Sequence, residues 1–246
     1  MSLERGSSPA CLFYAGSAHR MMRALAPRPI SMPILLVLHG DVLDPWCWIA
    51  EKRIGIAVEE LHGRFLPLEH APLPRRWEPR APSAGERQNR IRELKRAARE
   101  ADAPPFSTEL WSGGGTGPQS SGPPLLAIAA ARLQGLPAAN RLRAALREAA
   151  LVAGLDISRR DVITEVATRC GLDLADFVPS FEAPATERAL LDDIEESYAL
   201  GVDAGPALVI NDDWLVSGAR SLRHYRRLLK RYLATRVGTP VEHTVH

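Results

Sequence analysis

The order of apolar and polar positions divides residues 33–73 into a strand, a helix and a second extended segment. The apolar run of residues 33–39 predicts a buried strand. In residues 45–61 apolar side chains recur every three or four positions, which predicts a long helix with one buried face. Residues 64–73 indicate another strand, in which Pro67 favours a sheet edge or a bulge. Together these segments predict a βαβ unit.

Residues 74–124 show weaker periodicity and many residues that break helices. The proline-rich residues 74–82 predict an irregular segment. Residues 86–101 are highly charged and predict a surface helix with a thin apolar stripe. That stripe consists of Ile91, Leu94 and Ala98. Residues 103–124 contain five glycines with repeated proline and serine, so we expect a long irregular loop there.

From residue 125 to residue 200 the pattern is helical. The predicted helices span residues 125–134, 138–152, 158–170, 173–181 and 185–200. Helix ends are marked by Gly135, Gly154, Gly171 and Gly201. Ser158 and Asp161 have the spacing of a capping box at the start of the third helix.

The C-terminal part returns to extended structure before a last helix. Residues 207–210 and 214–217 predict paired strands, and the polar residues 211–213 predict the turn between them. Residues 222–233 predict the final helix. Its expected buried side chains are Leu222, Tyr225, Leu229, Tyr232 and Leu233. The pattern as a whole is that of an α/β protein.

The composition is that of an ordinary globular chain. At 246 residues, with 46% hydrophobic and 24% charged residues, the chain can bury a sizeable core. A net charge of +2 gives no argument for a nucleic acid or a membrane surface as partner. We find no apolar run of transmembrane length and no signal-peptide pattern at the N-terminus. Residues 1–32 predict a loosely ordered extension, and Met32 is an alternative start of translation.

The cysteines and histidines give no indication of a disulfide-stabilised protein or of a metal-binding protein. Three widely spaced cysteines, Cys11, Cys47 and Cys170, form no disulfide framework, which favours a reducing compartment, and we expect the cytoplasm. No metal-ligand spacing links His39, His62, His70 and His224, so no metal site is expected.

The candidate chemistry lies in residues 41–48, Asp-Val-Leu-Asp-Pro-Trp-Cys-Trp, between the first strand and the first helix. Asp44 suits the N-cap and Pro45 the first helical position. Trp46 and Cys47 then fall in the first turn, where free N–H groups and the helix dipole favour negative charge and can stabilise a thiolate.

This stretch resembles Asp-x-x-Cys-Pro-Trp-Cys-Trp/Tyr-Ile, which opens the active-site helix in the FrnE-like branch of the DsbA family. It is also similar to Asp-Val-Leu-Ser-Pro-Tyr-Ser-Trp of kappa-class glutathione transferases and 2-hydroxychromene-2-carboxylate isomerases. Asp44 stands where these families have the attacking cysteine or the glutathione-contacting serine, and only the second cysteine remains, as Cys47.

A second motif lies near the C-terminus. Residues 201–210, Gly-Val-Asp-Ala-Gly-Pro-Ala-Leu-Val-Ile, and residues 215–219, Leu-Val-Ser-Gly-Ala, closely resemble the FrnE-type pattern Gly-Val-x-Gly-Val-Pro-x-x-Val-Ile…Leu-Val-Ser-Gly-Ala. The resemblance makes Pro206 the counterpart of the family's cis-proline, packed beside the active-site helix. Gly205 replaces the usual valine or threonine, which we expect to widen the groove at that point. The resemblance covers residues 34–236.

The resemblance implies a thioredoxin-like core (βαβ … ββα) with an inserted all-helical domain. The expected parts are an N-terminal extension (1–32), the first half of the core (33–82), the helical insertion (83–200, with the loop 103–124), the second half of the core (201–236) and a C-terminal tail (237–246).

The two catalytic candidates, Cys47 and Asp44, also have structural interpretations. A lone cysteine is more often a buried packing residue than a reactive thiol. For Asp44, helix capping is favoured over catalysis, because a carboxylate cannot attack a disulfide and its charge would repel a thiolate. Asp41 is either a turn residue or, as in related folds, a buried acid that assists proton transfer.

The substrate-binding candidates are Pro45, Trp46, Gly205 and Pro206. An aromatic residue beside the proline can form a binding groove, although packing in the core is the commoner fate. The last helix is basic, with Arg223 among its cations. We interpret these residues as a solvated face and not as a binding site for an anionic partner.

Three functions remain open. The first is a DsbA-family thiol–disulfide oxidoreductase-like protein, for which dithiol chemistry is doubtful because Asp44 replaces the attacking cysteine. The second is a glutathione-dependent isomerase or transferase of kappa type, although residues 217–220, Ser-Gly-Ala-Arg, lack the Gly-Ser-Asp-Arg of kappa enzymes. The third is a non-catalytic thioredoxin-fold binding module. The expected partner is a thiol- or disulfide-bearing peptide or small molecule, with glutathione as the co-substrate and no other cofactor, and a homodimer is compatible with the sequence.

Overall fold

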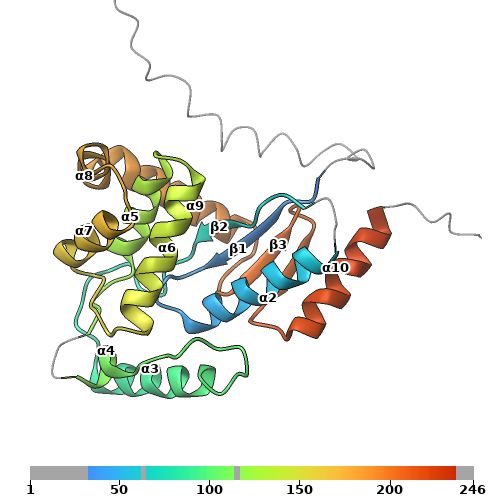
Figure 1. Cartoon of the computed structure of the whole chain (residues 1–246), viewed down its shortest axis with the longest axis horizontal. Helices are drawn as coiled ribbons and strands as arrows, with labels where there is room; N and C mark the ends of the chain where they lie inside the picture. Colours follow the sequence, from blue (N-terminus) through green and yellow to red (C-terminus); the bar gives the residue numbers. More distant parts are fainter. Residues whose placement is uncertain (1–32, 62–64, 114–116, 237–246) are drawn as a thin grey trace, which may run out of the picture. The chain divides into compact units, whose positions relative to one another are not determined.

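The computed structural model describes residues 33–61, 65–113 and 117–236, which form a four-stranded sheet and a set of helices (Figure 1). The expected N-terminal extension (1–32) and C-terminal tail (237–246) lie outside the described residues. Within the described part, no helix combines the length and the hydropathy that a membrane span requires.

The sheet has the strand order β2-β1-β3-β4. Its strands are β1 (Leu36–Gly40), β2 (Glu69–Pro72), β3 (Ala207–Ile210) and β4 (Trp214–Ser217). β1 is parallel to β2 and antiparallel to β3, and β3 pairs with β4 in antiparallel register. β2 lies at the edge of the sheet, as predicted, but it begins only at Glu69, so Pro67 lies before the strand and not within it. The hairpin turn places Asn211 and Asp212 at positive φ, which these residue types tolerate well.

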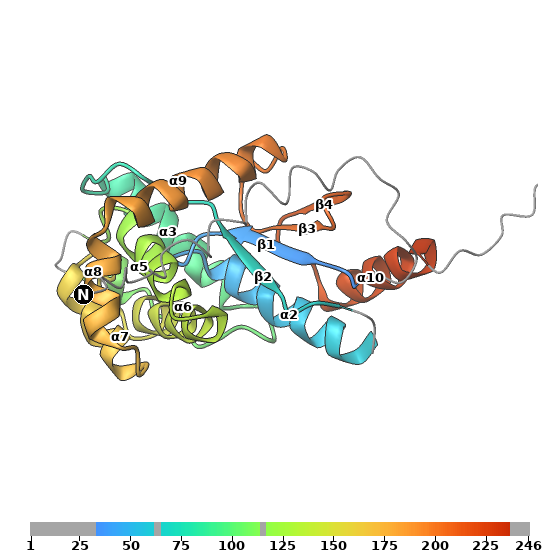
Figure 2. The ribbon, with the colours of Figure 1, turned by 90° about the horizontal axis from the view of Figure 1, so that it is seen from above.

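One face of the sheet is covered by α2 (Pro45–Leu61) and α10 (Leu222–Arg236), which also pack against each other. Leu208 and Ile210 of β3 belong to the core on this face, whereas Ala207 and Val209 face the other side, as alternation along a strand requires. Leu200, just after α9 (Pro184–Ala199), packs on that second side. Figure 2 shows α9 and α2 on opposite sides of the sheet.

The helical block comprises α5 to α9 and has its own apolar core. The remaining members are α5 (Gly122–Arg132), α6 (Leu136–Leu151), α7 (Arg160–Arg169) and α8 (Leu174–Glu182). Three alanines on α5, Ala127, Ala130 and Ala131, are fully buried, which allows the neighbouring helices to approach closely. Val42 and Leu43, in the turn before α2, belong to the same core. The predicted α/β core with a helical insertion is thus confirmed, and the helical block packs directly on the turn that carries the candidate chemistry.

The prediction of an irregular connection over residues 103–124 was partly wrong. The segment contains a short helix, α4 (Glu109–Ser112), and α5 already begins at Gly122. Leu110 and Trp111 of α4 are buried in the core of the helical block. The many glycines and prolines concealed this short apolar pair, whose burial anchors the segment.

The capping box is at the start of α3 (Ala84–Ala97), not at Ser158 and Asp161 as predicted. At α3 the Ser83 hydroxyl accepts from the Glu86 N–H at 3.2 Å, and the Glu86 carboxylate accepts from the Ser83 N–H at 2.8 Å. Ser158 instead donates to Asp156, because α7 begins only at residue 160. In the stripe of α3, Ala97 is buried and Ala98 is the exposed C-cap, since the helix ends there.

Candidate functional site

β1 ends at Gly40, and the carboxylate of Asp41 fixes the turn that follows. Asp41 Oδ1 accepts a hydrogen bond from the Leu43 N–H at 2.8 Å, and Oδ2 accepts one from the Arg75 N–H at 2.7 Å. Asp41 is buried, so these two donors satisfy a group that would otherwise be costly to remove from water. Asp41 thereby ties the start of α2 to the segment after β2.

Asp44 caps α2, as its sequence position predicted. Its Oδ1 accepts from the Trp46 N–H at 2.8 Å, and its Oδ2 lies 3.4 Å from the Arg75 Nη1. The residue is only 3% exposed. Burial raises the pKa of the Asp44 carboxyl from 3.8 to about 6, against the opposing charge of Arg75 and with a further contribution from Glu93. A helix N-terminus alone would lower this pKa, so burial outweighs the helix dipole here.

The thiol of Cys47 is wholly enclosed. Its exposed fraction is 0%, and Cys47 and Cys170 are both free cysteines. Burial raises the pKa of the Cys47 thiol well above its ordinary value, the Asp44 carboxylate raises it further, and the charge of Arg147 opposes both effects. The sulfur is therefore protonated at neutral pH, which agrees with the interpretation of Cys47 as a buried packing residue.

Two glycines bring the two sequence motifs into contact around this sulfur. A Cβ on Gly40 would lie 2.3 Å from the Cys47 Sγ and 4.0 Å from the Pro206 Cα. A Cβ on Gly205 would lie 2.9 Å from the Gly40 Cα and 3.6 Å from the Cys47 Sγ. The Gly205–Pro206 bond is cis. A side chain at Gly205 would thus meet the backbone of Gly40, and the expected widening of the groove stays a prediction.

Two residues beside the thiol, Gly205 and Trp46, are partly open to solvent. Gly205 is half-buried, and its N–H and C=O groups make no backbone hydrogen bond to another described residue. The side chain of Trp46, next to Cys47 on α2, is also half-buried, and its Nε1 has no acceptor among the described residues. The Arg96 guanidinium lies 5.2 Å from the centre of the Trp46 ring. Pro45, by contrast, is buried and offers little surface to a ligand.

Sequence reasoning missed a buried cluster of charged groups behind the thiol. Glu51 of α2 forms ion pairs with Arg147 and, at 3.6 Å, with Arg143 of α6. The His70 Nε2 lies 3.0 Å from the Glu51 carboxylate. Although burial opposes ionisation, the charge of Arg147 holds the pKa of Glu51 below its ordinary value. Burial lowers the pKa of His70 to about 4, so the imidazole is neutral and the cluster carries a net positive charge.

The only sequence signal of this cluster was the spacing of two arginines, Arg143 and Arg147, on the face of α6 that also carries Leu146. Arginines within an apolar helix face require a buried counter-charge. Their partner, Glu51, is 96 residues away from Arg147 in the sequence, so no local pattern could identify it.

Comparisons with known proteins place these features in context. A family model described as a DSBA-like thioredoxin domain matches residues 36–230. The crystal structure of a protein disulfide isomerase candidate from Nitrosomonas europaea is similar, with a TM-score of 0.73 and 19% identity, and covers 83% of this chain and 99% of that chain. The cytosolic disulfide reductase DsbM from Pseudomonas aeruginosa, solved with GSH, has a TM-score of 0.63 and 21% identity, with 81% and 99% coverage.

A curated relative also matches part of the chain. It is the ClpXP adapter protein SpxH of Shouchella clausii, 34% identical over 88 residues, which are 36% of this chain. The chain spans 29% of the length of that relative.

Proposed function

The chain belongs to the DSBA-like thioredoxin domain family, and on this premise we propose that it is an oxidoreductase-like protein that binds thiol- or disulfide-bearing partners without dithiol exchange of its own. The burial of Cys47 carries the proposal, together with Asp44, which caps α2 and is buried three residues earlier in the chain.

Thiol–disulfide exchange requires a thiolate that attacks and a second thiol that resolves the mixed disulfide. The Asp44 carboxylate cannot form a mixed disulfide, and Cys47 is protonated, enclosed and free. Reduction of a bound disulfide would therefore consume two molecules of an external monothiol, such as glutathione, and release one molecule of its disulfide. The protein itself would contribute binding and orientation.

The loop before Pro206 supports binding of an extended partner. The backbone groups of Gly205, which make no backbone hydrogen bond within the described residues, can form strand-like hydrogen bonds with an extended peptide. The half-buried Trp46 offers an aromatic surface. The Shouchella clausii relative is named as an adapter, which is a binding function, and the Pseudomonas aeruginosa reductase was solved with GSH.

We also propose a cytoplasmic location. The two described cysteines are free thiols, as expected in a reducing compartment, and the Pseudomonas aeruginosa reductase is described as cytosolic.

A second candidate function is glutathione-dependent isomerisation or transfer of kappa type. The pKa of about 6 at Asp44 favours it, because a carboxylate with a raised pKa is a better acceptor for the proton of a bound thiol. Its weakness is that Arg75 and the surrounding side chains cover Asp44 in this structure.

Reduction of insulin disulfides by dithiothreitol tests the main proposal. The wild-type protein should be no faster than a Cys47→Ser variant, whereas Asp44→Cys should gain activity, because it supplies a thiol at a helix N-terminus. Circular dichroism of each variant excludes unfolding as the cause. Wild-type catalysis that disappears in Cys47→Ser would overturn the proposal, and glutathione-dependent catalysis that requires Asp44 but not Cys47 would favour the kappa-type function.

A further inference from the structure

A pocket of about 540 Å³ opens beside the start of α2, between α3 and the segment that follows β2. Its cationic lining consists of Arg75, Arg76, Arg90, Arg92 and Arg96. Glu86 and Glu93 are the acidic residues of the lining, which leaves a formal charge of +3 on the pocket wall.

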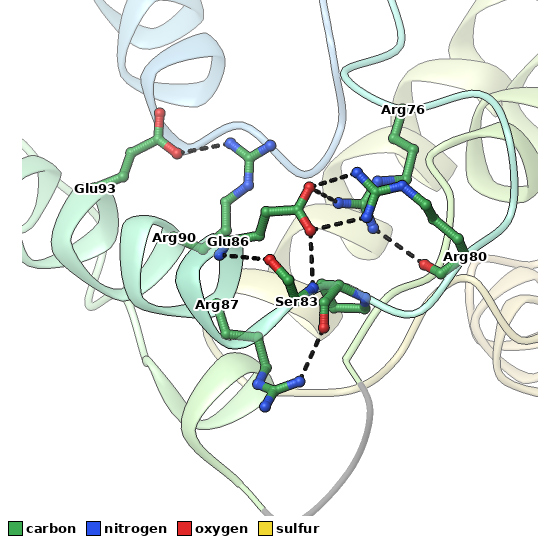
Figure 3. A network of polar contacts seen from close by, with 8 residues as sticks. Arg76, Arg80, Ser83, Glu86, Arg87, Arg90 and Glu93 are labelled. Carbon is green, nitrogen blue, oxygen red and sulfur yellow. Dashed lines mark hydrogen bonds and ion pairs between the residues drawn. The ribbon is translucent and has the colours of Figure 1, made fainter.

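The two carboxylates in the wall are already engaged by arginines. Glu86 accepts from Arg76 at 2.8 Å and from Arg80 at 2.6 Å while it completes the capping box with Ser83. Figure 3 shows these contacts around Glu86. Glu93 is likewise paired with two arginines, Arg75 and Arg90.

Arg75 and Arg90 each lie 2.9 Å from an oxygen of Glu93. Because both acids are fully engaged in these ion pairs, they present little free negative charge to the pocket.

Two of the arginines have no carboxylate partner within the described residues. Arg92 donates to the side-chain oxygen of Asn89, and Arg96 stacks over the ring of Trp46. A guanidinium group offers five N–H donors in a planar fork that matches carboxylate and phosphate oxygens. Most donors of Arg92 and Arg96 are therefore free to bind a ligand.

We propose that this pocket binds a small molecule with at least two anionic groups, carboxylates or phosphates, held by Arg92 and Arg96. Its volume lies in the range of about 300–1,000 Å³ that is usual for small-molecule sites. A ligand with one charge would leave much of the excess positive charge unmatched, whereas a multivalent anion neutralises it.

The pocket is connected to the candidate site by two of its own residues. Arg75 pairs with Asp44 at 3.4 Å, and Arg96 lies over Trp46. An anion that withdraws either guanidinium changes the surroundings of Asp44 or Trp46 directly. The anion site itself does not rest on the proposed function, because it requires neither Cys47 nor an exchange reaction.

Calorimetric titration of the full chain with pyrophosphate and with citrate, at fixed ionic strength, tests the proposal, and acetate serves as the singly charged probe. We expect at least one multivalent anion to bind saturably and more tightly than acetate. Binding of citrate alone identifies a carboxylate ligand, binding of pyrophosphate alone a phosphate ligand, and either result supports the site.

The variants Arg92→Gln and Arg96→Gln should each weaken this binding about tenfold, as loss of a charge-assisted contact implies. The matched control is Lys95→Gln, which removes one charge from an exposed position of α3 outside the pocket wall, and it should change the affinity less than about twofold. The bound anion should also alter tryptophan fluorescence in the wild type but not in Trp46→Phe. Equal weakening by Lys95→Gln, or no preference for either multivalent anion over acetate, would overturn the proposal.

Discussion

Replacing Asp44 by asparagine should stabilise the protein near neutral pH. Asparagine is as good an N-cap as aspartate, and its side-chain oxygen can still accept from the Trp46 N–H. The change removes a negative charge that is only 3% exposed. Arg75 keeps a carboxylate partner, because it also pairs with Glu93 at 2.9 Å.

The size of the effect follows from the raised pKa of Asp44. The rise from 3.8 to about 6 corresponds to about 3 kcal/mol at about 1.4 kcal/mol per pKa unit. Because the pKa is higher in the folded than in the unfolded state, the folded state gains a proton first as the pH falls. The contribution of Asp44 to stability is therefore complete below about pH 3.8, and about 3 kcal/mol of it is lost as the pH rises through about 6. The Asp44→Asn variant has no such loss, because the asparagine side chain does not titrate in this range.

Urea unfolding of both proteins measures this difference. The advantage of Asp44→Asn should be about 1 kcal/mol at about pH 4.5 and about 3 kcal/mol at about pH 7.5. Asp173→Asn is the matched control, because Asp173 caps α8 through the Ala175 N–H at 2.9 Å but is exposed, and its effect should stay within about 0.5 kcal/mol at either pH. If Asp44→Asn is less stable than the wild type, and increasingly so at higher pH, the Arg75 pair outweighs burial and the reasoning is refuted.

Two further changes test the packing around the site. Gly205→Val should lower the free energy of unfolding by about 1–3 kcal/mol in thermal unfolding, because its Cβ would lie 2.9 Å from the Gly40 Cα. The control Gly55→Ala, for which there is open space within α2, should be neutral or stabilising in the same experiment. Equal effects of the two variants would contradict the close approach at Gly205. Glu51→Gln should destabilise the protein by about 3–5 kcal/mol in urea unfolding, because it leaves two buried arginines without their counter-charge. A loss within about 0.5 kcal/mol would contradict this and show that the cluster is hydrated.

The elements with strong local patterns could be predicted from the sequence. The apolar residues 207–210 followed by Asn-Asp-Asp form β3 and its turn with the predicted bounds, because a short buried strand and a turn of residues that tolerate positive φ need no distant information. The start of α2 at Pro45 was equally clear from its cap.

Features that depend on distant contacts could not be predicted. The capping box of Ser83 and Glu86 is a local pattern that could have been found, whereas the burial of Trp111 depends on the core of the helical block. The raised pKa of Asp44 arises from burial by segments far along the chain, and a helix start by itself indicates the opposite direction. The pairing of Glu51 with Arg147 likewise joins α2 to α6.

The most direct test of the account is a gel-shift alkylation titration of the wild-type protein across glutathione redox poises. The account predicts no two-electron transition that joins Cys47 to another cysteine of the chain, since the thiol is enclosed and protonated, and a new transition in Asp44→Cys, where the C-P-W-C pair is restored. An intrachain disulfide that includes Cys47 in the wild type, formed at a defined potential while the protein remains folded, would contradict it.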